Sequence, residues 1–189
     1  MKIGSVRGVS LIEVMVTIGV LGILLSVALP SFTELIARRR LQAVTAEIAN
    51  DLAFARSQAA LNPQDVFLTF KQNTSMNCYT IQTGSATALC DCTRGAGLAC
   101  PATQFGPSPE MKVMQLATST GITFTPSATN WAAANNKVGF ISPQMFPSAA
   151  NFGITVSNST ASLRVELNGI GRASTCSPNG SFGGGVPTC

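Results

Sequence analysis

The chain has 189 residues, of which 46% are hydrophobic and only 11% are charged, and its formal net charge is +4. This length allows one modest domain and one additional segment. The small net charge is unlike the dense basic surface of a dedicated nucleic-acid binder. The sequence has no histidine, Walker loop or Gly-x-Ser-x-Gly elbow, so it lacks the most common general base and the usual nucleotide-binding and nucleophile motifs. We therefore expect no enzyme activity, no cofactor and no bound metal.

The most distinctive stretch is Gly8-Val9-Ser10-Leu11-Ile12-Glu13, which opens an apolar run that ends at Pro30. The run from Val9 to Leu29 contains 21 residues and one charge, Glu13. At about 1.5 Å of rise per residue, a helix of this length spans roughly the 30 Å hydrocarbon core of a bilayer. The sequence therefore predicts a transmembrane helix, in which the carboxylate of Glu13 is costly and needs a reason.

A cleavable secretory signal and a plain single-pass anchor both share features with this stretch. A secretory signal has the same basic leader, and Ser26-Val27-Ala28 is a passable site for signal peptidase. Against it, Glu13 interrupts the apolar run, and the sequence after Ala28 continues as an amphipathic helix. A plain anchor accounts for the helix but for neither Gly8 nor Glu13.

The basic leader, Gly8 before the apolar run, the Ser-Leu-Ile-Glu that follows and Pro30 at the far end resemble the N-terminus of type IV pilins and of type II secretion pseudopilins. The resemblance implies that residues 1–8 are a prepilin leader, that a prepilin peptidase cuts between Gly8 and Val9, and that Val9 is then N-methylated. It also implies that Glu13 guides assembly by pairing with the N-terminal amine of a neighbouring subunit.

A helical period resumes after Pro30, where the missing N–H and the crowding ring predict a kink or a short unwound segment. Apolar residues recur at spacings of three, four and seven, and charged residues lie largely off this stripe. The stripe consists of Leu35, Leu41, Val44, Ile48, Leu52, Ala55 and Ala59, and the charges off it are Arg38, Glu47, Asp51 and Arg56. We expect the stripe to cover a sheet, and Asn62-Pro63 to end the helix.

The stretch from Ile36 to Ser57, with its Arg-x-Arg-Leu-Gln and its Ala-Arg-Ser, resembles the H-type (GspH/FimT) branch of that family. This branch comprises the H-type pseudopilins of type II secretion and the FimT and FimU minor pilins. The resemblance implies a structural fibre subunit whose partners are other pilin or pseudopilin subunits, a prepilin peptidase and inner-membrane lipid. It implies a single-pass protein of the bacterial inner membrane with a periplasmic head, later assembled into a pseudopilus or pilus.

Beyond residue 62 the period changes from helical to alternating. Short segments of this kind, divided by Gly, Pro, Asn and Ser clusters, predict strands. They are Val66–Lys71, Cys78–Gln82, Lys112–Ala117, Ile122–Thr125, Lys137–Ile141, Gly153–Ser157 and Ser162–Asn168. We therefore expect an α+β fold, in which a long helix over residues 9–62 precedes an antiparallel β-sandwich head over residues 63–189.

Six cysteines fit a domain that folds in an oxidising compartment such as the bacterial periplasm. Cys176 and Cys189 bracket a Gly- and Pro-rich loop, and closing it with a disulfide is worth roughly 3 kcal/mol. The other four cysteines lack the Cys-x-x-Cys pairs of common zinc ribbons, so we favour disulfides over a zinc site. Two pairings stay open for them: Cys78–Cys90 with Cys92–Cys100, or Cys78–Cys92 with Cys90–Cys100.

Near the C-terminus, Gly171-Arg172 resembles the family's closing Gly-Arg-x-Arg motif, which is implicated in DNA binding by FimT-like members. Ser174 stands where the second arginine would be. The alternative function is therefore a DNA-binding minor pilin at a pilus tip that acts in DNA uptake. Its contact would be Arg172 with the Cys176–Cys189 loop, where Phe182 offers a ring for base stacking. The low net charge weighs against this alternative.

Overall fold

The computed structural model describes residues 8–84, 90–100, 110–126, 136–149, 152–180 and 182–189, without the side chains of residues 27–31 and 126. Two compact units make up the chain, residues 1–37 and residues 38–189, and each is described by itself. Residues 1–7 of the predicted leader and the loop segment around Trp131 lie outside the described residues.

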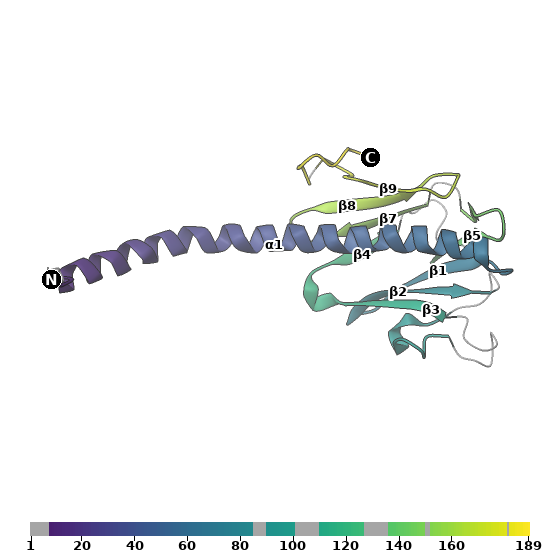
Figure 1. The fold of residues 1–189 in the computed structure, drawn as a ribbon, viewed down its shortest axis with the longest axis horizontal. Helices are drawn as coiled ribbons and strands as arrows, with labels where there is room; N and C mark the ends of the chain where they lie inside the picture. The colour runs from purple at the N-terminus through teal and green to yellow at the C-terminus, as the bar shows by residue number, and fades with distance from the viewer. Residues whose placement is uncertain (1–7, 85–89, 101–109, 127–135, 150–151, 181) are drawn as a thin grey trace, which may run out of the picture. The chain divides into compact units, whose positions relative to one another are not determined.

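One helix, α1 (Leu11–Leu61), contains both of the predicted helical segments (Figure 1). It begins where the carbonyl of Ser10 accepts hydrogen bonds from the amides of Glu13 and Val14, at 3.0 and 3.2 Å. It ends just before the predicted stop at Asn62-Pro63. Pro30 lies inside its helical bounds, and the kink predicted there stays a prediction.

In the first unit, the described side chains from Leu11 to Ser26 are all exposed. Twelve large apolar side chains between Val9 and Leu25 are exposed by 45% or more. Among the residues that the structure describes, no helix meets both the length and the apolar character needed to cross a membrane. The transmembrane span stays a prediction.

The first sheet of the second unit has five strands in the order β3-β2-β1-β5-β6, all paired antiparallel. Its strands are β1 (Val66–Gln72), β2 (Met76–Thr83), β3 (Glu110–Ala117), β5 (Lys137–Ile141) and β6 (Phe146–Pro147). The turn between β1 and β2 is fixed by Asn73, whose Oδ1 accepts from the amides of Ser75 and Met76, as asparagine commonly does in turns. This hairpin sets Phe70 opposite Tyr79.

The second sheet has four strands in the order β4-β7-β8-β9, again antiparallel throughout. Its strands are β4 (Thr123–Pro126), β7 (Phe152–Ser157), β8 (Ser162–Leu167) and β9 (Ala173–Cys176). Burial alternates strictly along β8, as expected for a strand with one face in the core and one in solvent. The α+β prediction, a helix followed by two antiparallel sheets, is therefore confirmed.

One hydrophobic core joins the C-terminal half of α1 to both sheets, and Figure 1 shows this half of the helix lying along the strands. The predicted stripe is buried from Leu41 onwards, whereas Leu35 is 51% exposed. Phe70 of the first sheet packs against Phe152 of the second, with ring centroids 6.1 Å apart. Each fully buried apolar side chain contributes about 1.5–3 kcal/mol, so the core fixes this part of the helix on the sheets.

Two strands and two short helices lie where the sequence analysis predicted neither a strand nor a helix. Strand β6 has two residues, and β9 is the polar segment Ala-Ser-Thr-Cys; neither offers an apolar alternation to recognise. The 3-10 turns are η1 (Cys92–Arg94) and η2 (Thr118–Thr120). Pairing with neighbouring strands, and not intrinsic pattern, therefore makes β6 and β9.

All six cysteines form disulfides, and the bonds are Cys78–Cys92, Cys90–Cys100 and Cys176–Cys189. The predicted local pair at the C-terminus is present. The structure selects the second of the two open pairings, because β2 sets Cys78 next to the turn η1. With every thiol bonded, the four-cysteine zinc alternative is wrong.

The segment around these bonds is also tied by polar contacts. Lys71 Nζ lies 2.8 Å from a carboxylate oxygen of Asp91, and the hydrogen bond from Lys71 lowers the pKa of Asp91 to about 2. The carboxylate of Glu110 accepts from the amides of Gly97 and Ala99, at 2.6 and 3.1 Å. Two disulfides, one ion pair and the two hydrogen bonds to Glu110 therefore stabilise the segment of residues 90–100.

Candidate functional site

The residues that the sequence assigns to processing lie at the exposed start of α1. Gly8 and Val9 are exposed, Val9 by 70%. A Cβ added to Gly8 would meet nothing within 4 Å, so packing within the chain does not require glycine at this position.

Glu13 lies in the first helical turn, and its side chain is exposed among apolar neighbours. It forms no ion pair with the residues that the structure describes. A carboxylate in the first turn interacts favourably with the helix dipole, by about 0.3–1 kcal/mol. That gain is smaller than the cost of moving an unpaired carboxylate into apolar surroundings.

A second cluster fixes α1 to the first sheet. Tyr79 on β2 donates its hydroxyl hydrogen to Asp51 Oδ2 at 2.6 Å, and Lys112 on β3 donates to Asp51 Oδ1 at 2.9 Å and to Glu47 Oε1 at 3.2 Å. Asp51 and Tyr79 are both buried. The prediction that Asp51 lies off the buried stripe is therefore wrong, because two strands supply its partners.

The ionisation of this cluster follows from its burial. Desolvation of Tyr79, with the hydrogen bond to Asp51 and that residue's charge, raises the pKa of the tyrosine well above its ordinary value of 10.0. For Lys112, burial acts to lower the pKa, but hydrogen bonds to Asp51 and Glu47 outweigh it and raise the pKa above 10.5. At neutral pH Tyr79 is therefore a neutral phenol and Lys112 a cationic amine, and both can donate the hydrogen bonds that the cluster contains.

The C-terminal disulfide loop packs into the head. Phe182 is 5% exposed and belongs to the hydrophobic core, and its carbonyl accepts a hydrogen bond from Arg38 Nη1 at 3.1 Å. The prediction that Phe182 is a ring available for base stacking is therefore wrong. The apolar ring is more stable in the hydrophobic core than in water. The Cys176–Cys189 loop therefore packs with this ring buried.

Arg172, the predicted DNA contact, is exposed. It lines an open pocket of about 500 Å³ with Arg56 of α1, and sequence reasoning did not bring these two arginines together. Arg164, the other basic residue of this region, lies 3.3 Å from Glu166, which offsets its charge. The extended basic track that a nucleic-acid strand needs is not formed by these residues.

Two family models match different segments of the chain. The family model of the type II transport protein GspH matches residues 44–171, and the model of the prokaryotic N-terminal methylation motif matches residues 4–29. Among solved structures, the minor pseudopilin EpsH from the type 2 secretion system of Vibrio cholerae is similar, with 12% sequence identity and a TM-score of 0.44. That match covers 72% of this chain and 96% of EpsH.

No curated protein matches the sequence. The DNA-uptake alternative is not supported, because Phe182 is buried, Arg164 is paired and the matching family is one of type II transport. The GspH model covers more than half of the chain, and the methylation motif occupies the segment that sequence analysis singled out. The chain therefore belongs to the GspH family of type II transport proteins and is a structural pseudopilin (minor pilin) subunit of a type II secretion system.

Proposed function

We propose that this subunit enters the pseudopilus through the N-terminal part of α1, after cleavage between Gly8 and Val9. The observation that carries the proposal is the exposed apolar surface of residues 9–25, where twelve large apolar side chains are at least 45% exposed. An apolar surface of this extent must be covered by lipid or by another protein. Inner-membrane lipid covers it before assembly, and the helices of neighbouring subunits cover it afterwards.

Processing at Gly8 is supported by the methylation motif over residues 4–29 and by the open surroundings of the glycine. A prepilin peptidase removes residues 1–8 and leaves Val9 as the new N-terminus, which is then N-methylated. This amine keeps its positive charge. It is therefore a suitable partner for a carboxylate that must enter apolar surroundings.

Glu13 is the residue that makes assembly specific. Its carboxylate has no ion-pair partner among the described residues of its own chain, and burying it alone would cost several kcal/mol. The N-terminal amine of the neighbouring subunit offsets that cost at one axial position only. Glu13 therefore sets the register of the subunit, and Pro30 lets the helix bend between its two parts.

The topology follows from charge and from disulfide chemistry. Lys2 and Arg7 of the leader favour a cytoplasmic N-terminus under the positive-inside rule. The three disulfides are stable in an oxidising compartment. The subunit is then a single-pass protein of the inner membrane, with residues 63–189 in the periplasm.

The test is a Glu13→Ala variant, expressed with a prepilin peptidase and the remaining secretion components. We expect membrane insertion, cleavage at Gly8 and methylation of Val9 to be unchanged, because none of these steps needs the carboxylate. Mass spectrometry checks the cleavage and the methylation. Incorporation into pseudopili and secretion of a reporter should both fall. The matched control is Glu34→Ala, which removes another exposed glutamate of α1 and should assemble normally. Normal incorporation of the Glu13→Ala subunit would refute the register argument.

A further inference from the structure

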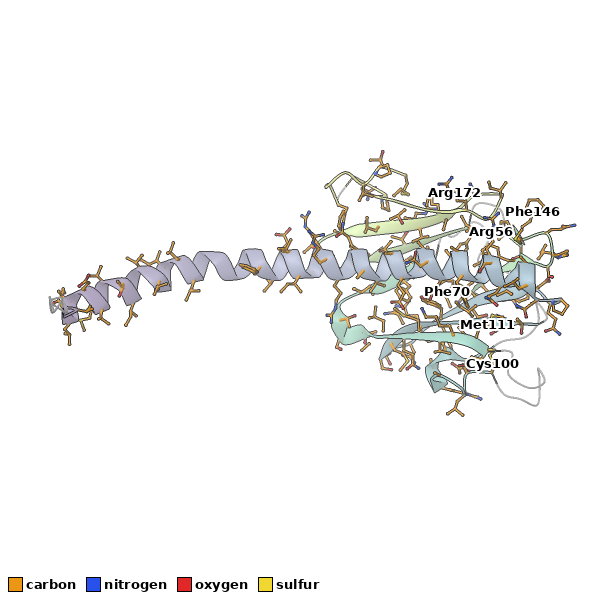
Figure 2. All side chains as sticks on the ribbon, viewed as in Figure 1. Arg56, Phe70, Cys100, Met111, Phe146 and Arg172 are labelled. Carbon is orange, nitrogen blue, oxygen red and sulfur yellow. A yellow bond between two sulfur atoms is a disulfide. The ribbon has the colours of Figure 1, made fainter. Side chains whose placement is uncertain are left out.

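Two family-like motifs that are far apart in the sequence meet at one pocket of the head. Arg56 comes from the Ala-Arg-Ser of α1, and Arg172 follows Gly171 in the turn between β8 and β9; Figure 2 shows both side chains at the same end of the head. They line the pocket of about 500 Å³ described above, called here the two-arginine pocket. Its lining is Ala49, Asn50, Ala53, Arg56, Ser57, Met145, Gly171, Arg172 and Ala173.

The lining carries two guanidinium groups and no acid. Arg56 Nε is buried and has no hydrogen-bond partner among the described residues, and a buried unsatisfied donor costs about 1–3 kcal/mol. Because guanidinium groups bind carboxylates through paired, charge-assisted hydrogen bonds, the pocket has the chemistry of a carboxylate site.

Gly171 allows the two motifs to approach each other. Its φ of +78° is in the left-handed region, and a Cβ there would lie 3.0 Å from the carbonyl oxygen of Met145 and 3.2 Å from Arg56 Nε. Any larger residue would be strained and would push against the arginine. Because position 171 is a glycine, Arg56 can lie beside the β8–β9 turn. Arg172, the residue after Gly171, belongs to the same turn.

The remaining lining favours a protein side chain over a nucleic acid. Ala49, Ala53 and Met145 give the pocket an apolar wall. Phe146 and Ile170, which are next in sequence to the lining residues Met145 and Gly171, are 49% and 58% exposed. A phosphodiester chain needs a series of basic contacts along its length, whereas this concave site offers two.

We propose that the two-arginine pocket binds a glutamate or aspartate side chain of a neighbouring subunit, with an apolar residue of that subunit packed against Phe146. The partner rests on the proposed assembly into a pseudopilus. The binding of a carboxylate rests on the pocket alone. An experiment can therefore refute the neighbouring subunit as the partner without refuting carboxylate binding, and the reverse.

The direct test measures binding of the peptide acetyl-Leu-Glu-Leu-amide to the full chain in mild detergent, by titration calorimetry or NMR. The matched neutral probe is acetyl-Leu-Gln-Leu-amide. We expect the glutamate peptide to bind about tenfold more tightly, which is the effect of one charge-assisted hydrogen-bond pair. Arg172→Gln should abolish this difference, and Arg94→Gln, which changes an exposed arginine outside the pocket, should retain it.

A second variant guards against a folding defect. Ala53→Glu places a carboxylate in the pocket three residues before Arg56, so it should compete with the peptide and abolish binding while the melting temperature stays equal or rises. Ala46→Glu, at another exposed helical position, should bind the peptide normally. Equal affinity for the two peptides, or tighter Arg172-dependent binding of a twelve-nucleotide single strand, would overturn the proposal.

In cells, Arg172→Glu should lower incorporation into pseudopili while cleavage and methylation of Val9 continue. If Glu13→Ala assembles normally but Arg172→Glu does not, the pocket stands and the register argument fails. If Arg172→Glu assembles normally, the pocket does not bind a neighbouring subunit.

Discussion

The contact between Tyr79 and Asp51 makes the sharpest prediction about stability. Tyr79→Phe keeps the buried ring, which lies 5.2 Å from the ring of Phe70, and removes only the hydroxyl that donates to Asp51 at 2.6 Å. A hydrogen bond to a charged group is worth about 1.5–3 kcal/mol. Asp51 still keeps Lys112 Nζ, 2.8 Å from Oδ2, so the carboxylate is not left unpaired.

We therefore expect Tyr79→Phe to lower the free energy of unfolding by about 2 kcal/mol. For a domain of about 150 residues this corresponds to a fall of about 4–8 °C in melting temperature. The assay is urea unfolding of the full chain in mild detergent, followed by near-UV circular dichroism. A double-mutant cycle with Asp51→Asn should give a coupling energy of about 1–2 kcal/mol, because the two groups are in direct contact.

Glu47→Gln is the matched control, since Glu47 contacts the same lysine but its side chain is 42% exposed. An exposed ion pair contributes about 0–1 kcal/mol, so this variant should change stability little. The reasoning is wrong if the free energy of unfolding of Tyr79→Phe lies within about 0.5 kcal/mol of that of the parent chain. This margin is smaller than the smallest contribution expected of the hydrogen bond. The reasoning is also wrong if Glu47→Gln costs as much as Tyr79→Phe.

Two further predictions concern alkaline pH and the disulfides. The pKa of Tyr79 is raised in the folded chain above its ordinary 10.0, so the contribution of Tyr79 to stability should be fully present below pH 10 and fall by about 1.4 kcal/mol per pH unit above it. Because Tyr79 is the one tyrosine in the chain, tyrosinate absorbance should rise only as the head unfolds; a rise that precedes unfolding would contradict its burial. Replacing Cys176 and Cys189 by serine should cost about 3 kcal/mol in urea unfolding, and added reductant should weaken the parent chain more than this variant. Peptide mapping that finds Cys78 joined to Cys90 would refute the pairing described above.

The helix and most strands were predictable because their patterns are local. Leu41, Ile48 and Leu52 repeat at helical spacing, and burial confirms them. The bond between Cys176 and Cys189 was predictable because the loop between them is short and rich in glycine and proline. In these cases the residues that decide the structure are close together in the sequence.

The contacts that escaped prediction depend on residues far apart in the sequence. Asp51 is buried because Tyr79 and Lys112, on two different strands, reach it. The pairing of Cys78 with Cys92 depends on where β2 meets η1. Arg56 and Arg172 share a pocket because Gly171 lets the turn approach the helix. No periodic pattern in the sequence predicts these long-range contacts.

The helix α1 has two different apolar patterns, one in each of its halves. The difference explains why the sheets of the chain bury only the C-terminal half. From Leu41 to Ala59 the apolar residues form one stripe, which the chain's own sheets bury. From Leu11 to Leu25 large apolar residues occur on all sides and stay exposed. A striped helix is buried by its own fold, whereas a helix that is apolar all round needs surroundings that are apolar all round. The second unit therefore completes its core without residues 9–25, and their exposed apolar surface is the one that we propose lipid and then other subunits cover.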